Sequence, residues 1–82
     1  MNAARIENSK RLQRTLSALR KAGDRGLTTM ELYLATGSMA VHSDVAELRA
    51  PCNDFPISCE MSGTNASGRR VYTYRLVKAE AA

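Results

Sequence analysis

The sequence predicts a single α+β domain in which three helices precede a two-stranded β-hairpin. Apolar residues recur at helical spacing up to about residue 50 and alternate with a period of two from residue 56. Capping and breaking residues divide the helical part into three segments. The 82 residues suffice for one domain with a thin core. We expect this domain to span residues 1–82, with a core at 8–77 and frayed tails at 1–5 and 78–82.

The first predicted helix covers residues 6–22, and one face of it is apolar. The apolar stripe consists of Ile6, Leu12, Leu16 and Leu19. Asn8 or Ser9 offers an alternative cap for a later start. The opposite face carries Lys10, Arg11, Arg14 and Lys21. Gly23 is the expected end of this helix because glycine is favoured just past a helix C-terminus.

The second predicted helix covers residues 29–36 and begins with a capping box. Thr28 precedes Glu31 by three residues, so each side chain can bond an otherwise free backbone amide in the other's turn. Gly37 ends this helix, and Ser38 is expected to cap a third helix over residues 39–50, which Pro51 ends. Helical spacing predicts that the third helix buries Val41, Val45 and Leu48. Two capped helices joined by a turn with glycine are typical of a helix-turn-helix.

The last third of the chain predicts the hairpin. Ile57, Cys59 and Met61 alternate with polar residues, which indicates a strand over 56–62 and makes Cys59 a core thiol. Residues 62–68 are small or polar and predict a loop. Residues 71–77 are rich in β-branched and aromatic side chains and predict the second strand.

Two stretches carry a resemblance to a known family. The first runs from Leu27-Thr28-Thr29-Met30-Glu31-Leu32 into Thr36-Gly37-Ser38. The second is Asp44-Val45-Ala46-Glu47-Leu48-Arg49-Ala50, followed by Ile57-Ser58-Cys59, a polar tip, Gly68-Arg69-Arg70 and Tyr72-Thr73-Tyr74-Arg75-Leu76. Over residues 8–77 the chain resembles the small phage-encoded winged helix-turn-helix domains. The resemblance implies that fold, with the hairpin as the wing, and binding to DNA or, as in some winged helices, to protein.

The chain departs from this family pattern in two places. Ser43-Asp44 stands in the middle of the third helix, where such families often carry a basic residue. The turn at 51–56 is longer than the usual one and lacks glycine. The first departure argues against base reading in the major groove by this helix. The second affects only the geometry of the turn.

The DNA-binding residues follow from this fold. If the third helix enters the major groove, its outward residues face the bases. The outward set is Ser38, His42, Ser43, Glu47 and Arg49, and Asp44 is expected near the boundary of this face. Of these, we expect Ser38, His42, Ser43 and Arg49 to contact DNA. Arginines on a hairpin tip are attracted by the negative potential of the minor groove. The wing residues expected to contact DNA are Thr64, Asn65, Ser67, Arg69 and Arg70. The alternative for each surface is a solvated helix face or a polar loop.

The charge is unevenly distributed along the chain. The net charge is +4, but residues 26–68 hold one basic side chain against five acidic ones. Those acids are Glu31, Asp44, Glu47, Asp54 and Glu60. The basic residues lie mostly before and after this acidic middle, so the basic face of the first helix is a further candidate for phosphate contact. The acidic middle is where a protein partner is expected if the chain does not bind DNA.

We expect no catalytic site, no metal and no cofactor. His42 is the only histidine, and Cys52 and Cys59 lack the further ligands that zinc needs. No apolar run approaches the ~20 residues that cross a bilayer, and residues 1–10 lack the apolar region of a signal peptide. We therefore expect a cytoplasmic protein without a membrane partner, in the host cytoplasm if it is phage-encoded.

The leading hypothesis is a double-stranded DNA-binding protein of phage or prophage type, acting in transcription regulation or as an architectural factor. A single small module contacts little DNA, so a homodimer or cooperative binding is expected. Met30, Leu34 and Met39 are the candidates for an exposed apolar patch. The alternative is a winged-helix protein-binding module, such as a phage inhibitor of a host enzyme or defence complex.

Overall fold

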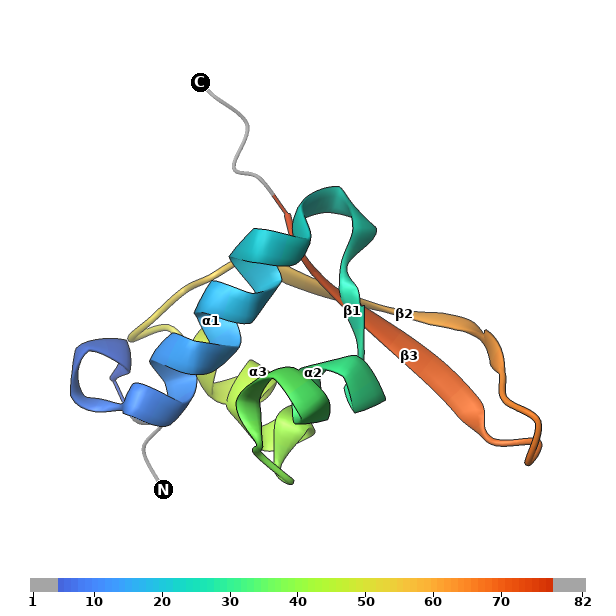
Figure 1. Cartoon of the computed structure of the whole chain (residues 1–82). Coiled ribbons are helices and arrows are strands. Elements are labelled where there is room, and N and C mark those ends of the chain that lie inside the picture. The colour runs from blue at the N-terminus through green and yellow to red at the C-terminus, as the bar shows by residue number, and fades with distance from the viewer. Residues whose placement is uncertain (1–4, 78–82) are drawn as a thin grey trace.

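The computed structural model describes residues 5–77 and shows three helices packed against a three-stranded antiparallel sheet (Figure 1). The helices are α1 (Lys10–Ala22), α2 (Thr29–Thr36) and α3 (Val41–Arg49). The strands are β1 (Leu27–Thr28), β2 (Ile57–Thr64) and β3 (Arg70–Leu76), in the sheet order β1-β3-β2. Short 3-10 turns, η1 (Ile6–Asn8) and η2 (Gly23–Arg25), flank α1. The α+β class is confirmed. The tails predicted to fray were 1–5 and 78–82, and all of their residues except Arg5 lie outside the described ones.

The core lies where the three helices meet the base of the sheet. It contains the predicted inner stripes of α1 and α3 together with side chains from α2 and the strands. Its buried members are Leu12, Leu16, Leu19, Leu27, Leu32, Val41, Val45, Leu48, Ile57 and Tyr74. Ile6, predicted to extend the stripe of the first helix, is only half-buried and packs at its edge.

Helix α1 begins at Lys10, later than the predicted start at residue 6, and its N-cap is Ser9, one of the two alternative caps. Ser9 Oγ accepts a hydrogen bond from the Leu12 amide at 3.2 Å, which is the usual N-cap arrangement. The preceding residues form the separate turn η1. The Ile6 amide donates to Asn53 Oδ1 at 2.8 Å and thereby ties this turn to the loop after α3.

Helix α2 has the predicted bounds and the predicted capping box. Thr28 Oγ1 accepts from the Glu31 amide at 3.1 Å, and Glu31 Oε1 accepts from the Thr28 amide at 2.8 Å. The hydrogen bond from the Thr28 backbone lowers the pKa of Glu31, because it favours the charged carboxylate. Gly37 ends the helix in a left-handed conformation with φ +75°.

Helix α3 is shorter than the predicted 39–50. Its N-cap residue is Ala40, which has no capping side chain, and Ser38 Oγ instead accepts from the Ala40 amide at 3.2 Å just ahead of the helix. The turn after the helix, the one without glycine, contains Asp54 at φ +55°. Aspartate tolerates this left-handed conformation better than most residues, so the turn can form without a glycine.

The sheet has three strands rather than the predicted two. Strand β1 pairs Leu27 with Tyr74 and Thr28 with Thr73, and so joins the α1–α2 connection to the hairpin. A strand of two residues is too short to show an alternating pattern. Its approach to β3 requires Gly26, because a Cβ there would lie 2.7 Å from the Tyr74 carbonyl oxygen.

The hairpin is confirmed, but its first strand does not bury the residues predicted. Strand β2 continues to Thr64, with a register shift between Met61 and Gly63. Only Ile57 of this strand is buried, whereas Cys59 is exposed and Met61 is 57 % exposed. Cys59 pairs with the buried Tyr74, yet it lies on β2, an edge strand of the sheet, and is exposed. The distal part of the hairpin runs beyond the helices (Figure 1).

Replacement of Gly26 tests the docking of β1. Gly26 has φ +70° and ψ −176°, a region that glycine alone adopts readily, and it also lacks room for a Cβ. Gly26→Ala should lower the free energy of unfolding by about 3 kcal/mol. Gly37→Ala is the matched control, since Gly37 is left-handed with open space around it, and should cost only about 1 kcal/mol. Urea unfolding followed by circular dichroism measures both, and equal losses would contradict the close approach.

Candidate nucleic-acid interface

The hairpin tip, residues 65–69, is a turn organised by one asparagine. Asn65 Oδ1 accepts hydrogen bonds from the Ser67 amide at 2.9 Å and the Arg69 amide at 3.0 Å. Its backbone amide donates to the Arg69 carbonyl oxygen at 2.9 Å, and its carbonyl oxygen accepts from the Gly68 amide at 2.9 Å. The oxygen of this side chain therefore shapes the tip rather than facing a ligand.

The arginines at the base of the tip are exposed cations. Arg69 and Arg70 are exposed, and no carboxylate of residues 5–77 forms an ion pair with either. Thr64 and Ser67, the other predicted contacts of this loop, are exposed as well. The hairpin thus presents two positive charges and several hydrogen-bonding groups, with no counter-charge from the described part of the chain.

A hollow of about 560 Å³, here called the hairpin groove, separates the start of β3 from α2 and the α2–α3 turn. It brings together four of the predicted contact residues, which are Ser38, Asn65, Arg69 and Arg70. The remaining lining is largely apolar and includes Met30, Tyr33, Met39, Val71 and Tyr72. Met39 is 89 % exposed, so the apolar part of the groove is open to solvent. The exposure predicted for Met30 and Met39, and for Leu34 outside the groove, is confirmed.

The outward face of α3 carries the other predicted contacts. His42, Ser43 and Arg49 are all exposed. His42 and Ser43 lie in the first turn, whereas Arg49 ends the helix, roughly 10 Å further along its axis. The Nδ1 atom of His42 is hydrogen-bonded to the hydroxyl of Tyr74 from β3. The sequence did not single out Tyr74, since only the sheet brings it to the sole histidine.

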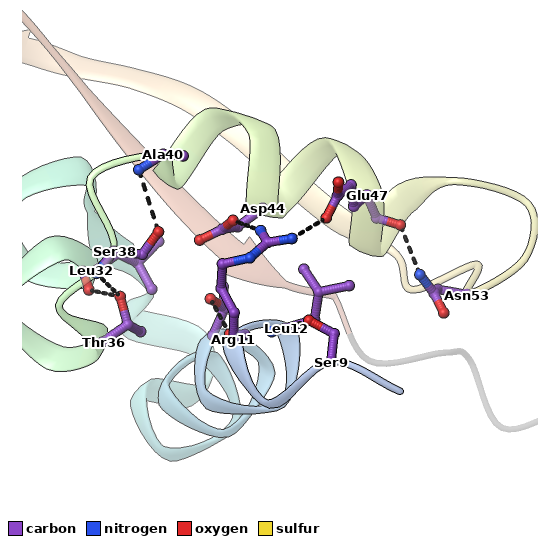
Figure 2. A network of polar contacts seen from close by, with 11 residues as sticks. Ser9, Arg11, Leu12, Leu32, Thr36, Ser38, Ala40, Asp44, Glu47 and Asn53 are labelled. Atoms are coloured by element: carbon purple, nitrogen blue, oxygen red, sulfur yellow. Dashed lines mark hydrogen bonds and ion pairs between the residues drawn. The ribbon is translucent and has the colours of Figure 1, made fainter. Parts of the chain in front are cut away.

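The acidic residues of α3 are held by Arg11, not left on the surface. Figure 2 shows the guanidinium of Arg11 between two carboxylates of α3. Nη1 contacts Asp44 Oδ1, and Nη2 lies 2.8 Å from Glu47 Oε2. Asp44, expected near the boundary of the outward face of this helix, is fully buried at 0 % exposure, and its Oδ2 accepts no hydrogen bond within residues 5–77. The hydrogen bond to Glu47 raises the pKa of Arg11.

This network corrects the expected role of Arg11. Arg11 was assigned to the basic face of the first helix, yet it turns toward α3 and is half-buried. Lys10, Arg14 and Lys21 of that face are exposed. Arg14 and Lys21 line a second hollow of about 380 Å³ together with Arg25, and it shares no residue with the hairpin groove.

Most of the acidic middle is paired with basic residues from elsewhere in the chain. Besides the two acids that Arg11 holds, Glu31 lies 3.5 Å from Arg25 and Glu60 lies 2.8 Å from Arg75. Of the five acids between residues 26 and 68, Asp54 alone forms no ion pair within residues 5–77. The negative segment in the sequence is therefore not a negative face of the folded domain.

No protein-family model, curated protein or solved structure matches this chain. Within residues 5–77, no three of the His, Cys, Asp and Glu side chains gather in a way that could hold a metal ion. No helix in the same range is long and apolar enough to cross a membrane.

Removal of Arg11 tests whether α3 depends on this ion pair. Arg11→Ala leaves the Asp44 carboxylate buried without its cation, so the free energy of unfolding should fall by about 3 kcal/mol. This value is at the low end for a broken buried ion pair because Arg11 is partly solvated. Arg14→Ala removes an exposed arginine from the same helix and should change it by under ~0.5 kcal/mol. Urea unfolding is the measurement.

A second variant separates the buried charge from the lost packing. Arg11→Met combined with Asp44→Leu removes both charges and fills the space with apolar groups, so it should recover most of the lost stability. If Arg11→Ala is as stable as Arg14→Ala, the α1–α3 packing does not depend on the pair.

Proposed function

We propose that this chain is a winged helix-turn-helix domain, similar to the small phage-encoded ones, that binds double-stranded DNA as a regulatory or architectural protein of a phage or prophage. The order α1, α2, α3 and then a long hairpin supports this reading. In it the β2–β3 hairpin is the wing and α3 is the recognition helix. The role is binding rather than catalysis, it needs no cofactor, and it places the protein in the host cytoplasm.

The two exposed arginines at the base of the hairpin tip, which form no ion pair within residues 5–77, carry the proposal. Arg69 and Arg70 line one groove with Ser38, so the tip and the N-terminal end of α3 form one surface. Cations in this position neutralise phosphates or enter a minor groove. Because Asp44 is buried and paired with Arg11, its negative charge does not lie on the outward face of α3 that would enter a major groove.

The two surfaces divide the work of binding. Phosphate contacts from the hairpin supply affinity and fix the register of the domain on the duplex. His42, Ser43 and Arg49 on the outward face of α3 supply contacts to base edges and flanking phosphates. Because one such module buries little surface, binding as a homodimer or on repeated sites follows from the proposal. The exposed Leu34, outside the hairpin groove, is available for such a contact.

A second candidate function is a protein-binding module, such as a phage inhibitor of a host enzyme or defence complex. The apolar part of the hairpin groove favours it, since Met30, Tyr33 and Met39 are large and exposed. With arginines beside these side chains, the matching partner is a segment with apolar residues flanked by carboxylates. The acidic middle no longer supports this function, because most of its members are paired inside the domain.

Salt dependence tests the DNA proposal. Anisotropy of a labelled random duplex should show binding at 50 mM salt that weakens steeply by 200 mM, because phosphate contacts release counterions. Arg69→Ala with Arg70→Ala should lower the slope of log K against log salt by up to about 1.8. Arg14→Ala with Lys21→Ala removes the same charge from the second hollow and should lower the slope less. Absence of binding at 50 mM salt would overturn the proposal. If both double variants lowered the slope equally, the hairpin would not be the main site of phosphate contact.

Selection from a library of displayed random peptides tests the second candidate. The wild-type chain should retain peptides with apolar residues next to Asp or Glu, and Met30→Ser with Met39→Ser should lose them. Leu34→Ser is the control, since Leu34 is as exposed as Met30 but does not line the groove. Failure to enrich any peptide sequence would count against a protein-binding groove.

A further inference from the structure

The imidazole of His42 is exposed at the surface, but its ring is fixed by contacts with Tyr74 of the sheet. His42 is the only histidine of the chain and lies in the first turn of α3. Its Nδ1 atom is hydrogen-bonded to the Tyr74 hydroxyl. The two rings also meet edge to face, with centroids 5.6 Å apart and an interplanar angle of 64°. An exposed side chain that is fixed by two contacts with one partner is unusual for a merely solvated helix face.

Tyr74 is well placed to hold it. It lies on the central strand β3, paired with Leu27 of β1 on one side and Cys59 of β2 on the other, and is 2 % exposed. Burial raises the pKa of this phenol to about 12, so the hydroxyl keeps its proton near neutral pH and can donate it. The tyrosine therefore reaches from the sheet to α3 and leaves little freedom to the histidine ring.

The remaining ring nitrogen of His42 is a hydrogen-bond donor in both charge states. A neutral imidazole has one N–H, and when Nδ1 accepts from Tyr74 that proton lies on Nε2. In the protonated ring both nitrogens donate, so Nε2 again carries a proton while Nδ1–H is directed at the Tyr74 oxygen. No hydrogen bond to Nε2 is formed within residues 5–77.

We propose that Tyr74 is a positioning residue that presents Nε2–H of His42 to an acceptor atom on a base edge in the DNA major groove. This inference rests on the proposed DNA-binding function. The acceptors of matching chemistry are purine N7, guanine O6 and thymine O4. A donor fixed in place loses less conformational entropy on binding than a free side chain and discriminates better against a base that offers a donor instead.

The test combines Tyr74→Phe with a matched control. Tyr74→Phe keeps the buried ring and removes only the hydroxyl. Thr73→Val removes a hydroxyl from the preceding residue on the opposite face of β3, where it donates to Ser62 Oγ at 2.9 Å. Each variant is compared with the wild type on two labelled duplexes, one recovered by selection from a random pool with the wild-type protein and one of scrambled sequence.

We expect Tyr74→Phe to bind the selected duplex roughly threefold to tenfold more weakly, the value of one hydrogen bond, with unchanged affinity for the scrambled duplex. Thr73→Val should change neither affinity. His42→Ala should lower affinity for the selected duplex at least as much as Tyr74→Phe, and the double variant should lose no more than His42→Ala, because both act through one donor. An unchanged affinity ratio in Tyr74→Phe, or an equal loss on both duplexes, overturns the proposal.

A measurement without DNA separates this inference from the proposed function. In ¹⁵N-labelled protein with a neutral imidazole ring, Nδ1 of His42 should have the chemical shift of an unprotonated nitrogen and Nε2 that of a protonated one. Tyr74→Phe should move both shifts toward the average of two exchanging tautomers. If those shifts do not change, Tyr74 does not position His42, even where the wild type binds DNA. If the shifts change but the wild type binds neither duplex, the proposed DNA-binding function is wrong, and so is the proposed contact between His42 and a base.

Discussion

The buried carboxylate of Asp44 is the constraint on which the rest of this small fold depends. A charge at 0 % exposure costs several kcal/mol unless a cation reaches it, so α3 can pack against α1 only where Arg11 is available. The same guanidinium holds Glu47, one turn further along α3 (Figure 2). The two contacts of Arg11 with Asp44 and Glu47 fix the rotation of α3 about its own axis. With the anchored side inward, the outward side is the one that carries His42 and Ser43.

Ion pairs between residues far apart in sequence neutralise most of the acidic segment. The segment between residues 26 and 68 is acidic as a stretch of sequence, but four of its five carboxylates form ion pairs with arginines from α1, η2 and β3. In the described part of the chain, Arg69 and Arg70 are among the cations without an ion-pair partner, and both are exposed at the base of the hairpin tip. A local net charge therefore predicts a partner poorly when the ion pairs join residues far apart in sequence.

The features predicted from the sequence are those that local chemistry determines. The Thr28–Glu31 box and Gly37 mark both ends of α2, and helical spacing identifies the inner stripe of α3, because caps and spacing act within a few residues. The features that were missed depend on partners remote in sequence. Strand β1 exists only through β3, the orientation of Arg11 depends on Asp44, and Cys59 is exposed on an edge strand although it pairs with the buried Tyr74. The same holds for Tyr74 beside His42.

Strand β3 connects the two surfaces on which the proposed function depends. Arg70 begins this strand at the hairpin tip, and four residues later Tyr74 holds His42 on α3. At ~3.3 Å per residue, the strand sets these two points roughly 13 Å apart. The B-DNA major groove is about 12 Å wide, so contacts made at these two points span roughly one groove width. Because β3 is the central strand of the sheet, the proposed base contact and the proposed backbone contact depend on each other's position.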